Sequence, residues 1–209
     1  MVKFNPQIFA DAEKAKEALY HHGVIAFPTE TVMGLGVLYN DYEAYQKLNS
    51  VKERPEDKPY TLMLNDPKDI KLYGVVNKAT QRVIDAFMPG PLTILIKVRN
   101  NAVPKYVTHD TGVIGIRVPT NIEAECVLRI AEMPLLVPSA NKSGEKPAMS
   151  SEEVIKIFGQ EVDFVVHGKA KTGVPSTIVD LTGDKPKVVR KGKITQSQID
   201  KVWKDNEKC

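Results

Sequence analysis

The stretch Val24-Ile25-Ala26-Phe27-Pro28-Thr29-Glu30-Thr31 joins a short apolar run to a polar turn, and it is decisive for the expected fold. Four consecutive apolar residues suit a strand that is covered on both faces. A helix pattern precedes the run over 8–22 and stops at Gly23, and another follows over 41–51. Because helices and strands alternate in this way, we predict an α/β domain in which helices pack on a mixed sheet.

The same alternation continues along the chain. Further helices are predicted over 77–88, in a short turn at Pro67, and after capping-box patterns that begin at Thr120, Ser150 and Thr195. Strands are predicted over 24–27, 61–64, 92–96, 113–118, 135–137, 164–166, 177–179 and 188–189. The stretch after Phe164 lacks a helix pattern, so we expect it to add antiparallel strands at one side. No segment resembles a linker, which predicts a single domain over residues 1–209.

Composition excludes several classes of protein. The chain has 209 residues, of which 42% are hydrophobic and 26% charged, so it is not intrinsically disordered. A net charge of +3 is too small for a histone-like coat on nucleic acid. Cys126 and Cys209 have no metal-ligand spacing with the four histidines, and we expect neither a zinc site nor a disulfide. Without a signal-peptide core or a membrane-length apolar run, we expect a cytoplasmic protein.

Generic nucleotide motifs are missing. The sequence has no P-loop and no nucleophile elbow, and Gly34-Leu35-Gly36 is only half of a dinucleotide-binding fingerprint. Polar segments instead follow predicted strands, where α/β sheets place their ligand crevices. Thr29–Thr31 could bind a small polar ligand, with the glycines letting it approach the backbone, or form an ordinary capping turn. The segment 138–144 could bind phosphate or ribose, or form an ordinary Ser/Asn/Gly turn.

Basic residues offer partners for an anion. Lys52, Arg54 and Lys58 could hold a phosphate chain, although neighbouring acids also allow a solvated loop. From 185 to 199 there are five basic residues and no acid, which indicates either an anion-facing edge or a basic tail in water. Arg117 ends an apolar strand and needs a partner, a role that a ligand carboxylate would fill.

Together these segments resemble the YrdC-like family of threonylcarbamoyl-AMP synthases. The matching residues are spread over 28–192 and lie in the following segments: Pro28-Thr29-Glu30-Thr31, Gly34-Leu35-Gly36, Lys52-Glu53-Arg54-Pro55, Pro89-Gly90-Pro91-Leu92-Thr93, Gly115-Ile116-Arg117-Val118-Pro119, Pro138-Ser139-Ala140-Asn141-Lys142-Ser143-Gly144, Ser176-Thr177-Ile178-Val179-Asp180 and Arg190-Lys191-Gly192.

The resemblance implies a YrdC-like fold, which is a twisted, open α/β sheet with a concave basic face, and a nucleotidyltransferase activity. Such enzymes condense L-threonine, bicarbonate or CO2, and ATP into threonylcarbamoyl-AMP and pyrophosphate, and a separate transferase then modifies tRNA. Mg²⁺ would accompany ATP, and no protein metal site is implied. The residues implied to bind ATP are Lys52, Arg54, Lys58, Ser139, Asn141 and Arg190, the first two being catalytic as well. The residues implied to bind threonine are Thr31, Arg117 and Ser176.

Three departures from the family pattern leave alternatives open. Many members carry a His in the region that here reads Tyr60-Thr61-Leu62-Met63-Leu64. Pro175 and Val113 replace residues common in other members, and the extra C-terminal domain of long-form members is absent, so we expect a short form. The alternatives are an RNA-binding or ribosome-maturation module, with weak RNA binding, and a paralogue without synthase activity. The Lys-x-Arg and Ser-x-Asn pairs favour the enzyme, whereas Met63 leaves room for the paralogue.

Overall fold

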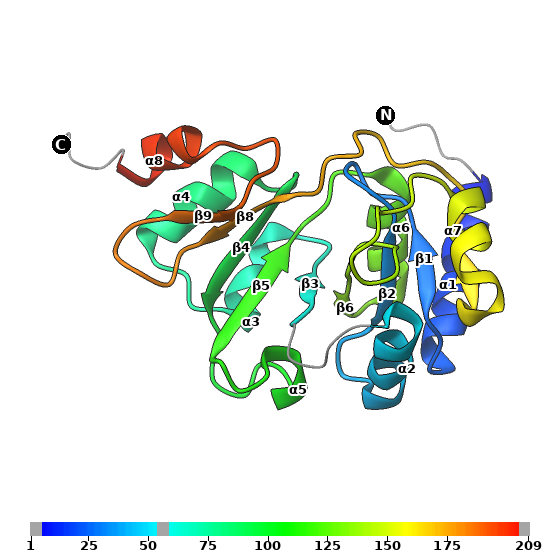
Figure 1. Ribbon diagram of the computed structural model, residues 1–209. Helices are drawn as coiled ribbons and strands as arrows, with labels where there is room; N and C mark the ends of the chain where they lie inside the picture. Colours follow the sequence, from blue (N-terminus) through cyan, green and yellow to red (C-terminus); the bar gives the residue numbers. More distant parts are fainter. Residues whose placement is uncertain (1–5, 54–58, 205–209) are drawn as a thin grey trace.

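The structure is a computed structural model that describes residues 6–53 and 59–204 (Figure 1). Its strands form one mixed sheet in the order β7-β1-β2-β6-β3-β5-β4-β8-β9. The strands are β1 (Ile25–Phe27), β2 (Gly34–Leu38), β3 (Thr61–Met63), β4 (Leu92–Lys97), β5 (Val113–Arg117), β6 (Leu135–Leu136), β7 (Phe164–Val165), β8 (Thr177–Asp180) and β9 (Lys187–Arg190). The helices are α1 (Pro6–Tyr20), α2 (Tyr42–Lys52), η1 (Pro67–Asp69), α3 (Ile70–Tyr73), α4 (Lys78–Phe87), α5 (Lys105–Thr108), α6 (Ile122–Ala131), α7 (Ser151–Phe158), η2 (Gly159–Glu161) and α8 (Gln196–Lys204). The predicted α/β class and mixed sheet are confirmed.

The part of the sheet that contains β1, β2 and β6 is covered on both faces. Successive residues of a strand point to opposite sides. Ile25 and Phe27 of β1 therefore pack in one apolar cluster with α1 and α6, while Ala26 packs in another with α2 and α7. Two-sided burial explains why the sequence of β1 is apolar at every position.

The other half, formed by β5, β4, β8 and β9, has a helix-covered face and a more open one. Ile116 of β5 and Ile94 of β4 share one apolar cluster with residues of α4 and α8, and α4 and α8 lie together beside these strands (Figure 1). The alternate residues of the same strands, Thr93, Arg117 and Ile178, line a cavity on the opposite face. The fold therefore leaves one face of half a sheet available to a ligand.

Strand register gathers these residues on the open face. Met63 pairs with Arg117, Thr93 with Ile178, and Ile178 in turn with Arg190. Paired residues on neighbouring strands share a face of the sheet. Side chains from five strands thus lie together on one face of the sheet.

The Gly34–Gly36 segment differs from its expected place in a turn. It forms β2, which pairs antiparallel with β1 so that Phe27 lies opposite Gly34 and Ile25 opposite Gly36. A Cβ added at Gly36 would lie 2.9 Å from a ring carbon of Phe27. Gly36 therefore makes room for Phe27 in the core and does not admit a ligand, whereas Gly34 lines the cavity described below.

Two further local expectations need correction. β9 pairs antiparallel with β8 at one edge, as expected, but β7 pairs in parallel with β1 at the opposite edge. The N-cap of α6 is Asn121, whose side chain accepts a hydrogen bond from the Ala124 N–H, and not Thr120. The reciprocal capping box between Thr195 and Gln198 does form at α8.

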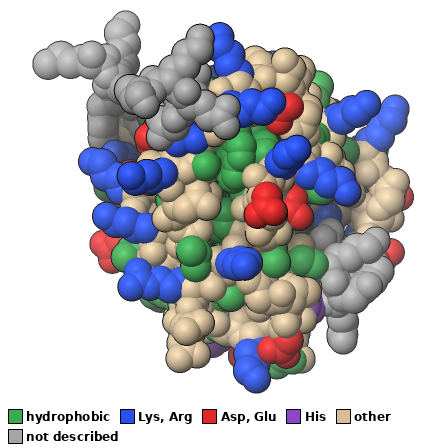
Figure 2. Space-filling model, turned by 90° about the vertical axis from the view of Figure 1, so that its left-hand side faces the viewer, with side chains coloured by type: hydrophobic (Ala, Val, Ile, Leu, Met, Phe, Trp, Pro, Cys, Tyr) green, Lys and Arg blue, Asp and Glu red, His purple; other side chains and the backbone are tan. Residues whose placement is uncertain are grey.

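The surface beside α8 and β9 is rich in cations. Figure 2 shows this side of the molecule, where Lys and Arg side chains are spread widely and Asp and Glu are fewer. The exposed basic residues predicted for this edge include Lys185, Lys187, Lys191 and Lys193.

Within residues 6–53 and 59–204, no helix combines the length and the apolar character needed to cross a membrane.

Candidate active site

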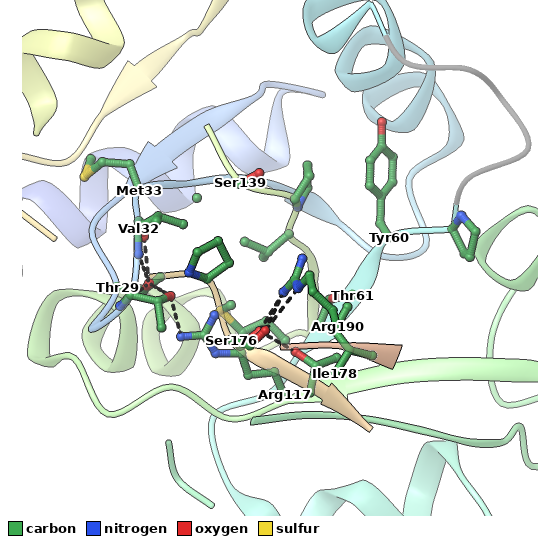
Figure 3. A pocket seen from close by; sticks show the side chains of 18 residues that line it. Thr29, Val32, Met33, Tyr60, Thr61, Arg117, Ser139, Ser176, Ile178 and Arg190 are labelled. Carbon is green, nitrogen blue, oxygen red and sulfur yellow. Dashed lines mark hydrogen bonds between the residues drawn. The ribbon is translucent and has the colours of Figure 1, made fainter. Parts of the chain in front are cut away.

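A cavity of about 150 Å³ opens above the uncovered part of the sheet. Its floor comes from β3, β4, β5 and β8, and its walls from the turns that follow β1 and β6. Figure 3 shows Arg117, Ser176 and Arg190 grouped in the cavity, with Thr29 and Val32 on one wall and Ser139 on another. A cavity of ~150 Å³ holds one molecule about the size of benzene. The enclosed part therefore suits an amino acid, and a nucleotide would have to extend beyond it.

Arg117 is the buried cation of this site. It is the last residue of β5, with an exposed fraction of 6%. Its Nη2 donates to Glu30 Oε1 at 2.7 Å and to Thr31 Oγ1 at 2.8 Å. The sequence led us to expect a ligand carboxylate as partner, but the structure supplies Glu30. Arg117 Nε is buried without a hydrogen-bond partner among the residues that the structure describes.

Thr29 fixes the hydroxyl of Thr31. Thr29 Oγ1 donates to the Val32 carbonyl at 2.7 Å and lies 2.8 Å from Thr31 Oγ1. A hydroxyl carries one hydrogen. Since Thr29 directs its hydrogen at Val32, the Thr31 hydroxyl must donate to Thr29. Thr31, which also accepts from Arg117, is left with lone-pair capacity, and it therefore presents an acceptor to a ligand.

Arg190 and Ser176 form the second polar group of the cavity. Arg190 Nε and Nη2 donate to the Ser176 carbonyl at 3.0 and 2.9 Å, and Nη2 also donates to Ser176 Oγ at 3.0 Å. Thr93 Oγ1 lies 2.8 Å from the same hydroxyl. The chain after β9 approaches closely, because a Cβ at Gly192 would lie 2.4 Å from the Thr177 nitrogen. Strand β9 thus holds its last side chain over the start of β8.

The electrostatics favour an anionic ligand. Burial of its guanidinium, followed by repulsion from Arg117, lowers the pKa of Arg190 below its usual value. Glu30 balances Arg117, but the described residues that line the cavity contribute two guanidiniums and no carboxylate. An anion bound here would relieve the repulsion between the two cations.

Lys52 supports the Ser139–Asn141 segment from behind. Its exposed fraction is 2%, and its Nζ donates to the carbonyls of Ser139 and Asn141, each at 2.6 Å. Ser139 Oγ in turn donates to Asn141 Oδ1 at 2.6 Å. Of these three residues, Ser139 is the one that lines the cavity. Lys52 therefore shapes a loop whose serine faces the site.

The structure brings together most of the residues selected from the sequence. Five of them line one cavity: Thr31, Arg117, Ser139, Ser176 and Arg190. Lys52 and Asn141 lie directly behind Ser139, while Arg54 and Lys58 lie outside the described residues. Sequence reasoning did not select Thr93, although a threonine at an alternate position of an apolar strand is a usable signal. It also gave no individual role to Glu30, whose partner is 87 residues away.

No protein metal site is visible in the part of the chain that the structure describes, where no three His, Cys, Asp or Glu side chains cluster. Cys126 is buried in the apolar cluster beneath α6. His109 Nε2 lies 3.3 Å from Tyr45 Oη, outside the set of residues that line the cavity. The polar side chains that line the cavity carry hydroxyl and guanidinium groups.

Comparison with known proteins identifies the relatives of the chain. The model of the Sua5/YciO/YrdC family, described as "Telomere recombination", matches residues 17–192. The threonylcarbamoyl-AMP synthase of Bacillus subtilis is 32% identical over 200 residues, which cover 95% of this chain and 57% of the relative. The chain thus spans little more than half the length of that relative. The family resemblance expected from the motifs is confirmed.

Solved structures share the fold. Pyrococcus abyssi Sua5, crystallised with L-threonine, matches with a TM-score of 0.87 and 28% identity over 93% of this chain and 57% of that one. Escherichia coli YciO matches with a TM-score of 0.85 and 28% identity over 93% of this chain and 95% of that one. One of these structures is of a threonine complex, while the other matches this chain over nearly the whole length of both.

Proposed function

Because this chain belongs to the Sua5/YciO/YrdC family, we propose that it is an L-threonylcarbamoyladenylate synthase. This nucleotidyltransferase would convert L-threonine, bicarbonate or CO2, and ATP into threonylcarbamoyl-AMP and pyrophosphate. The observation that carries the proposal is the convergence of Thr31, Arg117, Ser139, Ser176 and Arg190 on one cavity of amino-acid size. A cytoplasmic tRNA threonylcarbamoyl transferase would consume the product.

Threonine would occupy the enclosed part of the cavity. Arg117 has an unpartnered buried Nε–H, and a substrate carboxylate oxygen is a suitable acceptor for it. Thr31 offers an acceptor for the amino or hydroxyl group of the substrate, and Ser176 offers a hydroxyl from the opposite side. The apolar side chains that line the cavity, among them Val32 and Met63, would contact the methyl group.

ATP would extend outward from the same cavity. Ser139 and Arg190 lie at its wall, so the nucleotide would contact them, with Asn141 and Lys52 holding the serine loop in place. The resemblance adds Arg54 and Lys58 as triphosphate ligands. Mg²⁺ would arrive with ATP as part of the substrate and neutralise charge on the pyrophosphate leaving group.

The proposed chemistry needs no protein nucleophile. The threonine nitrogen first bonds to carbon and forms a carbamate: with CO2 the amine loses a proton, and with bicarbonate a carbon–oxygen bond breaks and water leaves. A carbamate oxygen then bonds to the α-phosphorus of ATP while the bond from that phosphorus to the bridging oxygen breaks, which releases pyrophosphate. Negative charge gathers in this step, so positioned cations and hydrogen-bond donors supply the stabilisation. The resemblance gives this role to Lys52 and Arg54, and Lys52 would act from behind Ser139, by its charge and by holding the serine loop in place.

A coupled assay tests the proposal. The protein is incubated with ATP, threonine, bicarbonate and Mg²⁺ in the presence of pyrophosphatase, and phosphate release is followed. We expect release that requires threonine and bicarbonate. Absence of threonine-dependent release would reject the synthase, and salt-sensitive RNA binding in its place would support an RNA-binding module.

A relative of the same fold without synthase activity is the second candidate. The observation that favours it is Met63, which lines the cavity, is 2% exposed and lies in the region where, by the resemblance, many family members carry a histidine. A thioether is only a weak hydrogen-bond acceptor. If Met63 removes an essential contact, Met63→His should create threonine-dependent pyrophosphate release. In a functional synthase the same substitution should instead leave release within a few-fold of the original.

A further inference from the structure

Glu30 is a buried carboxylate that stands behind the arginine of the site. Its exposed fraction is 8%. Arg117 is one of the described residues that line the cavity, and Glu30 is not. A charge is unfavourable in the protein interior unless it is paired and hydrogen-bonded. The buried pair of Glu30 and Arg117 therefore carries a cost in desolvation free energy.

Both carboxylate oxygens of Glu30 are anchored. Oε1 accepts from Arg117 Nη2 at 2.7 Å, and Oε2 accepts from the Thr120 backbone N–H at 3.3 Å. Thr120 lies three residues beyond the end of β5, so Glu30 connects the turn after β1 with the segment after β5. Because two hydrogen bonds hold the carboxylate in place, it can fix the position of the guanidinium that it binds.

Glu30 and Thr31 together determine how the guanidinium is oriented. Both accept from the same nitrogen, Nη2, at 2.7 and 2.8 Å. Nη2 carries two hydrogens, and a guanidinium is planar. With both hydrogens engaged by neighbours in the turn after β1, the plane of the group is fixed. Nε–H and Nη1 are then the donors that remain for a ligand.

The Nε–H of Arg117 is a free hydrogen-bond donor in the described part of the chain. Arg117 Nε is buried and has no hydrogen-bond partner among the residues that the structure describes, although most buried polar atoms are paired. An acceptor atom of a bound ligand would supply the missing hydrogen-bond partner of this Nε–H. A carboxylate oxygen is the acceptor that suits a guanidinium best.

We infer that Glu30 is a positioning residue, which aims the Nε–H of Arg117 at the carboxylate of the amino-acid substrate. This inference rests on the proposed function, because it takes threonine as the ligand of the cavity. Glu30 also carries a negative charge and would repel that carboxylate, so positioning and repulsion predict opposite effects when the charge is removed.

Two substitutions separate these effects. Glu30→Gln keeps the size but loses the charge, and its amide NH2 cannot accept from Thr120. Glu30→Asp keeps the charge but is about 1.5 Å shorter, so it cannot span both anchors. Dissociation constants are measured by calorimetry for L-threonine and for L-threoninamide, which lacks the carboxylate. The control is Glu132→Gln, which removes an exposed partner of Lys16 far from the cavity.

Positioning predicts threonine binding weaker by about tenfold or more in both Glu30 variants, and threoninamide binding within about twofold of the original. KM for threonine should rise while KM for ATP stays within about twofold. Threonine binding that is unchanged or tighter in Glu30→Gln would overturn the inference, as would equal losses for both ligands. Failure of the unsubstituted protein to bind threonine would instead overturn the proposed function.

Discussion

Lys52 shows at the residue scale how a charged side chain can be part of the interior. Its Nζ lies 2.6 Å from two backbone carbonyls of the serine loop, and its exposed fraction is 2%. Each buried carbonyl that loses its donor destabilises a protein by about 1–3 kcal/mol. Lys52→Met keeps most of the apolar stem and removes the charge.

We therefore expect Lys52→Met to lower the free energy of unfolding by about 2–4 kcal/mol and to raise KM for ATP. Urea unfolding and the pyrophosphate assay measure the two effects. Lys156→Met, on the exposed side of α7, is the matched control and should change neither. An Lys52 variant with normal stability would show that the two carbonyls do not depend on this amine.

The division of substrates between cations gives a second prediction at this scale. Arg117 faces the enclosed part of the cavity, while the resemblance places Arg54 at the triphosphate. Arg117→Lys keeps a charge near Glu30 but loses the planar donor fork, so KM for threonine should rise by about tenfold or more. Arg54→Ala should chiefly impair the use of ATP. Steady-state kinetics with each substrate varied would contradict this division if both variants affect both substrates equally.

At the scale of elements, the start of α6 depends on Asn121 and not on its neighbour. Asn121 Oδ1 accepts from the Ala124 N–H at 3.0 Å, while Thr120 contributes its backbone N–H to Glu30. Loss of an N-cap side chain destabilises a protein by about 1 kcal/mol. Asn121→Ala should show this loss in chemical denaturation, whereas Thr120→Ala should remain within about 0.5 kcal/mol of the original. The reverse ranking would restore Thr120 as the cap.

The turn between α1 and β1 contains a pH-dependent contact. His22 Nδ1 lies 2.8 Å from Asp41 Oδ2, and hydrogen bonding and attraction to Asp41, then to Glu43, raise the pKa of His22 above 6.5. A raised pKa in the folded state stabilises the fold below the unfolded pKa, and this contribution disappears as pH rises through the folded pKa.

His22→Asn removes this charge and tolerates the positive φ of 57° at this position. The melting temperature of the variant should therefore fall below that of the original at about pH 5, and the two should converge near about pH 9. Thermal unfolding at several pH values measures this. A difference that does not depend on pH would show that the ion pair adds nothing.

For the whole molecule, the important feature is that the cavity joins the two halves of the sheet. Thr31 and Ser139 come from the half covered on both faces, and Arg117, Ser176 and Arg190 from the half with an open face. A ligand that contacts both groups binds only the folded state. It therefore raises the apparent stability in proportion to the logarithm of its concentration.

Threonine and MgATP, each at about 100 times its dissociation constant, should each add roughly 2.7 kcal/mol, or about 5–10 °C in melting temperature for a chain of this length. Differential scanning fluorimetry measures the shift. The Arg117→Lys variant should lose the shift in melting temperature that threonine causes and retain the shift that MgATP causes. An equal shift with alanine in place of threonine would contradict a specific amino-acid site.

Local sequence was enough to predict the α/β class and to select five residues that line the candidate cavity. Alternation of apolar strands with capped helices is a local property, so it can be read from neighbouring residues, and the Lys-x-Arg and Ser-x-Asn segments carried the family resemblance. The Thr195 capping box was correct for the same reason. The errors at Gly34–Gly36 and at Phe164 concern strand pairing, which depends on residues far along the chain.

The roles of the polar residues depend on contacts between segments that are distant in the sequence. Glu30 and Arg117 are 87 residues apart, as are Lys52 and Ser139, and each pair meets through sheet register and loop packing. Sequence spacing is silent on such contacts. The fold thus changes the expected partner of Arg117 from a ligand to Glu30, and it leaves the Nε–H of that arginine as the donor for a ligand, because Glu30 and Thr31 already occupy its Nη2.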